Sequence, residues 1–107
     1  MTYSDLRGLP VSTTSAEALE AYERGLDLFL RWREGAPDAL QAAVTADPRF
    51  TLAHCTRAYV AWRTGKPVIA REAHQQAMAR ADDARDERER LHVRAVDAMQ
   101  RCDALTA

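Results

Sequence analysis

Apolar and small residues recur every three to four positions along most of the chain, which is the period of an amphipathic helix. In the first such stretch, residues 15–35, two apolar rows run side by side. One row holds Leu19, Tyr22, Leu26 and Phe29, and the other holds Ala18, Ala21, Gly25, Leu28 and Trp32. A helix that is apolar on two sides needs neighbours on both. We therefore predict that it is sandwiched within a stacked array.

Turn-forming residues divide the rest of the chain into four further helices. Gly and Pro stand together at Gly35–Pro37 and Gly65–Pro67, and Asp47 is followed by Pro48. Glycine favours the end of a helix and proline its first turn. We predict helices over about 15–35, 37–46, 49–64, 67–82 and 87–102. Thr14 and Glu17 fit a capping box at the first start, and Pro10 favours an extended arm over residues 1–14.

One short segment occurs twice. Residues 32–37, Trp-Arg-Glu-Gly-Ala-Pro, are echoed thirty residues later as Trp-Arg-Thr-Gly-Lys-Pro at 62–67. Each copy is expected to end one helix, turn on glycine and begin the next helix with proline. Repeated helix-turn-helix units bury one another's faces when they stack. The echo predicts an all-α, right-handed stack of antiparallel helical hairpins with about five helices, forming a single domain over residues 15–107.

A frame of thirty-four residues fits as well, and it is the spacing of a tetratricopeptide (TPR) solenoid. Small or helix-terminating residues occupy the packing positions of this frame. They are Ala36, Ala43 and Pro48 in the first unit, and Ala58, Gly65, Ala70 and Ala77 in the second.

Three segments together are similar to a known family. They are residues 9–15 (Leu-Pro-Val-Ser-Thr-Thr-Ser), residues 46–50 (Ala-Asp-Pro-Arg-Phe) with His54, and residues 88–96 (Arg-Glu-Arg-Leu-His-Val-Arg-Ala-Val). Their order and approximate spacing resemble the start of the tetratricopeptide repeat protein 38 family. The resemblance implies a helical-repeat fold. It also implies that this chain corresponds to the N-terminal part of a longer array, and it supplies no catalytic residue.

Charge and composition narrow the classes of partner. Fifteen basic residues stand against sixteen acidic ones, for a net charge of −1. Such a balance provides no general field to attract nucleic acid or an anionic membrane. No stretch approaches the ~18 apolar residues of a membrane span, and we expect no signal peptide. Cys55 and Cys102 do not suggest a disulfide framework, which favours reduced thiols and a cytoplasmic protein.

The three histidines lie on three different predicted helices. His54, His74 and His92 lack the short spacing of a zinc motif, and we interpret them as hydrogen-bonding groups between helices. We therefore predict no metal site and no cofactor. His54 and His92 are the pair most suited to a shared site, because they fall in family-like segments on first helices of adjacent units. Cys55 follows His54 directly, so the two side chains diverge by about 100° and do not form a nucleophile–base pair.

Aromatic residues on the third helix suggest a binding surface. Cys55, Tyr59 and Trp62 share a stripe with Leu52, and Arg63 lies beside it. Tyrosine, tryptophan and arginine are enriched among residues that dominate binding energy. The alternative is that Trp62 and Trp32 fill the turns between units. The repeat positions favour this packing role over ligand contact.

The prediction for function is non-enzymatic binding of a protein partner or a small ligand. A concave groove or an exposed terminal helix face would bind it, through His54, Cys55, Tyr59, Trp62, Arg63 and His92. Outer residues of the fifth helix also need cover, from further repeats or from a second copy in a homodimer; they are Val93, Val96 and Met99. The rival hypothesis is an enzyme, or a small-ligand, metal or haem protein, with a site between the third and fifth helices. That site would use His54, His92 and Tyr59.

Overall fold

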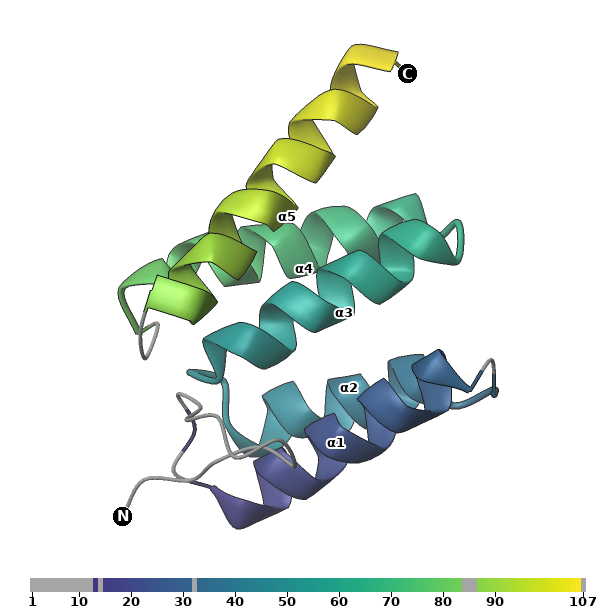
Figure 1. The fold of residues 1–107 in the computed structure, drawn as a ribbon, viewed down its shortest axis with the longest axis vertical. Coiled ribbons are helices and arrows are strands. Elements are labelled where there is room, and N and C mark those ends of the chain that lie inside the picture. The colour runs from purple at the N-terminus through teal and green to yellow at the C-terminus, as the bar shows by residue number, and fades with distance from the viewer. Residues whose placement is uncertain (1–12, 14, 32, 84–86, 107) are drawn as a thin grey trace.

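The computed structural model describes residues 13, 15–31, 33–83 and 87–106, and describes side chains as far as Arg101 apart from that of Asp83. This part of the chain forms five α-helices and one short 3-10 turn, with no strand (Figure 1). The all-α prediction is confirmed. The elements are α1 (Ala16–Leu30), α2 (Ala36–Ala46), α3 (Thr51–Arg63), α4 (Pro67–Ala79), η1 (Ala81–Asp83) and α5 (Glu87–Thr106).

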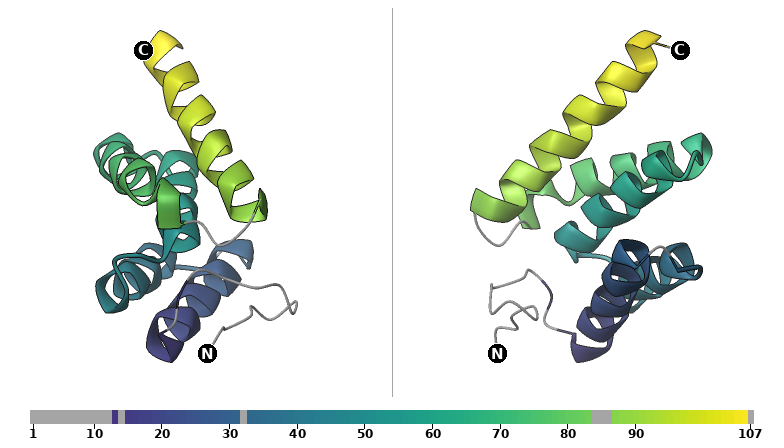
Figure 2. Two further views of the ribbon diagram at one scale, coloured as in Figure 1. Left: turned by 90° about the vertical axis from the view of Figure 1, so that its left-hand side faces the viewer. Right: turned by 45° about the vertical axis from the view of Figure 1, so that its right-hand side comes forward.

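The helices are arranged as two antiparallel hairpins followed by a single helix. Hairpin α1/α2 lies against hairpin α3/α4, and α5 packs against both α3 and α4. Because each second helix runs back along its hairpin, α1, α3 and α5 all begin at the same end of the molecule (Figure 1). The C-terminal half of α5 extends past the hairpins (Figure 2).

The helix ends follow local chemistry, with revisions at α1 and α4. The N-cap of α1 is Ser15, one residue after the predicted cap, and α4 ends at Ala79 rather than near residue 82. Ser15 caps α1, because its Oγ accepts a hydrogen bond from the backbone N–H of Ala18 at 3.1 Å. However, α1 ends at Leu30 rather than at Gly35, and Gly35, at φ 98°, immediately precedes α2. Gly65, at φ 72°, does end α3. Both echoed segments therefore contain a glycine with a positive φ, but Gly35 precedes α2 whereas Gly65 follows α3.

Part of the predicted N-terminal region lies outside the described residues. The extended arm 1–14 is described only at Thr13, and both Thr14 and Trp32 are outside as well. Thr13 is buried, and its hydroxyl donates a hydrogen bond to the Asp47 carboxylate, which also accepts from the N–H of Arg49. These contacts join the chain before α1 to the corner between α2 and α3.

Small residues allow the helices of each hairpin to approach closely. Gly25 of α1 faces Leu40 of α2, and a Cβ at Gly25 would lie 2.8 Å from Leu40 Cγ. Buried alanines thirty-four residues apart include the pairs Ala36 with Ala70, Ala39 with Ala73 and Ala43 with Ala77. The thirty-four-residue frame thus places buried alanines on both second helices, α2 and α4.

The orientation of α5 corrects one expectation. Val93 and Val96 were predicted to face outward, but they are 7% and 5% exposed and pack with Cys55, Ala58, Ala73 and Ala77. Leu91, on the opposite side of α5, is 55% exposed. The sequence of α5 offers apolar residues on two opposite sides, and the valines occupy the side that meets α3 and α4. Val93 and Val96 therefore do not need further repeats or a second copy of the chain to cover them.

Candidate functional site

A groove of about 530 Å³ lies between α1, α3 and α5. The first helix of each hairpin contributes one side of it, and α5 contributes the third. Most of its lining is apolar or aromatic. The lining residues are Tyr22, Leu26, Phe29, Leu30, Cys55, Thr56, Tyr59, Trp62, Arg88, His92, Ala95, Val96 and Met99.

Exposed aromatic side chains form one end of this groove. Tyr59 is 43% and Trp62 40% exposed, and their ring centroids are 6.5 Å apart. Phe29 meets Tyr59 edge-on at 6.0 Å, and Leu30 is 66% exposed beside them. The packing role favoured for Trp62 is therefore wrong. The cause is the direction of α5, which diverges from α3 and leaves this end of α3 uncovered (Figure 1).

The other end of the groove is more polar. Arg88 and His92, from the first turns of α5, line it with Thr56 and Cys55 of α3. The Thr56 hydroxyl donates to the Leu52 carbonyl at 2.9 Å. Burial raises the pKa of the Cys55 thiol to about 12, with a further contribution from the nearby carboxylate of Glu89, which is itself fully buried. Cys55 is consequently a neutral wall residue and a poor nucleophile.

Four of the six candidate residues meet in this groove: Cys55, Tyr59, Trp62 and His92. Arg63 lines a neighbouring pocket instead. The contributions of α1 and of Arg88 to the groove were not predicted from the sequence. Leu26 and Phe29 were recognised as one of two apolar rows, but that pattern could not show that part of the row would remain uncovered.

His54 is not part of the groove. It is 4% exposed, and its Nε2 lies 2.7 Å from the carbonyl oxygen of Pro48, at the corner before α3. Its Nδ1 is buried and has no hydrogen-bond partner among the residues that the structure describes. Burial lowers the pKa of His54, and the nearby Arg57 and Arg80 act in the same direction. The ring is thus a neutral donor to Pro48, and a site shared by His54 and His92 is contradicted.

His74 does connect two helices, as expected. Its Nε2 lies 3.0 Å from Oδ1 of Asp97, and Arg101 Nε lies 3.0 Å from the other oxygen. These hydrogen bonds, from His74 first and then Arg101, lower the pKa of Asp97. Among the residues whose positions are described, no three His, Cys, Asp or Glu side chains gather in a way that could hold a metal ion.

The buried neutral imidazole predicts a loss of stability in acid. The folded-state pKa of His54 lies below its ordinary value of 6.5, so the unfolded chain binds a proton more readily than the folded one. The contribution of His54 to the free energy of unfolding should therefore be fully present above pH 6.5. It should decrease as the pH falls through that value. We expect His54→Gln, which keeps a neutral donor for Pro48, to lose less stability than the wild type between pH 7.5 and 5.5.

Urea unfolding at these two pH values measures the effect. Equal losses in the wild type and His54→Gln would contradict it. Asp97 does not affect this comparison. Its pKa is lowered in the folded state, so its contribution to stability is lost only as the pH falls below its ordinary pKa of 3.8.

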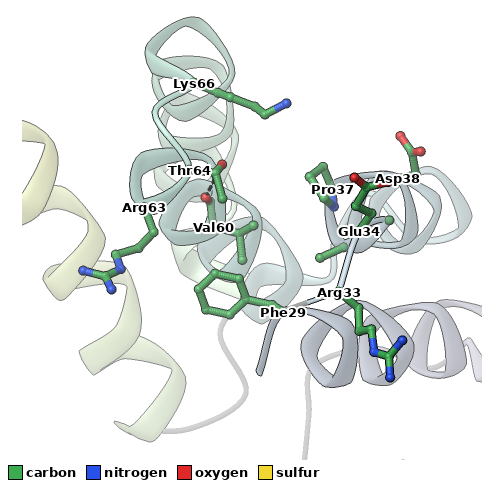
Figure 3. A pocket seen from close by; sticks show the side chains of 11 residues that line it. Phe29, Arg33, Glu34, Pro37, Asp38, Val60, Arg63, Thr64 and Lys66 are labelled. Atoms are coloured by element: carbon green, nitrogen blue, oxygen red, sulfur yellow. Dashed lines mark hydrogen bonds between the residues drawn. The ribbon is translucent and has the colours of Figure 1, made fainter. Parts of the chain in front are cut away.

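A second pocket, of about 520 Å³, lies between the two hairpin turns (Figure 3). Lys66 reaches from the α3–α4 turn toward the start of α2, where Asp38 is located, while Arg33 and Arg63 point away from each other (Figure 3). Its charges are of both signs and do not converge on one point. The groove between α1, α3 and α5 is therefore the stronger candidate for a functional site.

Comparison of the chain with protein-family models, curated proteins and solved structures finds no match. Within the described residues, no helix combines the length and the apolar character needed to cross a membrane.

Proposed function

We propose that this chain is a TPR-like helical-repeat module that binds a segment of a partner protein in the groove between α1, α3 and α5, without catalysing a reaction. The observation that carries the proposal is the exposure of Tyr59 and Trp62 at the edge of an apolar groove. Exposed apolar patches with polar borders are characteristic of interaction sites. Tyrosine and tryptophan are among the residues that contribute most to binding.

Several features support the repeat architecture. Hairpins α1/α2 and α3/α4 have buried alanines thirty-four residues apart, and α5 begins at the same end as α1 and α3. A right-handed TPR-like stack accounts for this order, with α5 as the first helix of a third unit. Together with the three similar segments, it favours membership of the tetratricopeptide repeat protein 38 family.

A protein segment fits the groove better than a small molecule does. Small-ligand sites usually enclose 70–90% of the ligand surface. Here Leu30, Tyr59 and Trp62 are 66%, 43% and 40% exposed. A small molecule bound in the groove would therefore leave much of this apolar surface in water. A polypeptide that lies along the groove can cover these side chains with its own surface. The high pKa of Cys55 also disfavours its use as a nucleophile at this site.

The proposal is tested by selecting displayed random 12-residue peptides against the purified protein. We expect the selected peptides to bind the Tyr59→Ala, Trp62→Ala double variant at least tenfold more weakly, because truncating an aromatic anchor typically costs about 2 kcal/mol or more. Val68→Ala is the matched control, since Val68 is 66% exposed on α4 and does not line the groove. Selection of no peptides, or equal binding to the double variant, would contradict the proposal.

A further inference from the structure

The two ends of the groove differ in chemistry, and this difference specifies the partner segment more closely. We infer, on the basis of the proposed function, that the groove binds a segment in which an acidic side chain lies a few residues from an apolar one. The apolar side chain contacts Phe29, Tyr59 and Trp62. The carboxylate is directed toward Arg88 and His92.

The helix directions separate these ends. Because α1, α3 and α5 begin at the same end of the molecule, Arg88 and His92, early in α5, fall beside Cys55 and Thr56, early in α3. Phe29, Leu30 and Trp62 stand at the opposite ends of their helices. From Cys55 to Trp62 the α3 axis rises by roughly 10 Å. An extended peptide covers that distance in about three residues, which sets the approximate separation of the acidic and apolar side chains.

The charge of the described lining favours a carboxylate over an ammonium group. Arg88 is a permanent cation of the lining, and the described lining contains no Asp or Glu. Glu89, whose carboxylate is near Cys55, does not line the groove and is 0% exposed. Arg88 and His92 each also interact with other groups of the chain. A guanidinium has five N–H donors, so Arg88 can donate hydrogen bonds to an additional carboxylate without giving up every existing contact.

The same displayed 12-residue library tests this inference. We expect the selected peptides to combine an aromatic or aliphatic residue with Asp or Glu about three positions away. In a synthetic copy of one such peptide, replacing the glutamate by glutamine should weaken binding to the wild-type protein about three- to tenfold. The difference should shrink in high salt, because exposed charges are screened.

Protein variants assign the effect to Arg88. In Arg88→Gln the glutamate and glutamine peptides should bind equally, whereas Arg88→Lys should retain part of the preference. If apolar peptides are selected with no acidic residue, or the glutamine peptide binds as well as the glutamate peptide, the inference is wrong while the proposed function stands. If no peptide is selected at all, the proposed function is contradicted, and the inference that rests on it falls as well. The comparison of the two peptides on the wild-type protein holds even if Arg88→Gln does not fold.

Discussion

Replacing Phe50 with alanine is expected to lower the free energy of unfolding by about 3–5 kcal/mol, the usual cost of emptying a well-packed aromatic site. Phe50 is 0% exposed, and its ring lies 5.1 Å from that of Tyr22 in the core shared by α1, α2 and α3. Its backbone carbonyl accepts hydrogen bonds from Ala53 and His54 at the start of α3, and alanine preserves these. The loss therefore comes from the side chain. Urea unfolding followed by circular dichroism measures it.

Leu91→Ala is the control for this change. Leu91 is 55% exposed on α5, so removing its side chain should alter stability by no more than about 0.5 kcal/mol. A small effect of Phe50→Ala, comparable to that of the control, would show that the junction between the hairpins is not packed as described.

The second large effect is expected where α1 and α2 approach most closely. A Cβ at Gly25 would meet Leu40 Cγ at 2.8 Å, Cδ2 at 2.9 Å and the backbone N at 3.3 Å. Leu40 is fully buried and has little room to move. Gly25→Leu should therefore separate the two helices and cost at least about 3 kcal/mol, as severe overpacking does. In Gly25→Ala the better helix propensity of alanine, about 1 kcal/mol, offsets part of a smaller clash.

A double variant separates this clash from a general helix effect. Leu40→Ala alone should cost about 2–5 kcal/mol because it leaves a cavity. In Gly25→Leu, Leu40→Ala the new leucine occupies part of that cavity, so the double variant should be more stable than the sum of the single losses predicts. Additive losses, measured by urea unfolding, would rule out direct contact between these two positions.

The helix pattern could be predicted because its signals are local. Asp47-Pro48 as a stop and the glycines at 35 and 65 each act on the turn in which they stand. The revisions arise where distant contacts decide the outcome. Whether Val93 or Leu91 faces inward depends on the position of α3 and α4, and the apolar pattern of α5 allowed both.

The site was predictable only in part, for the same reason. A stripe containing Cys55, Tyr59 and Trp62 follows from helical spacing, and all three line the groove. The exposure of Trp62 depends on the angle of α5, which no local pattern contains. His54 was grouped with His92 by its position in the chain, but its side chain hydrogen-bonds at the corner before α3 instead.

The position of α5 links the groove to residues that do not line it. Contacts of α5 with the hairpins include Val93 and the hydrogen bond between Asp97 and His74, while its C-terminal half extends beyond them. Undocking of α5 would remove one wall of the groove and leave the core of α1, α2 and α3 in place. When only a docked fraction can bind, the apparent dissociation constant rises in inverse proportion to that fraction. Substitutions at the α4–α5 contact can therefore change the apparent affinity of the groove for a partner that they never touch.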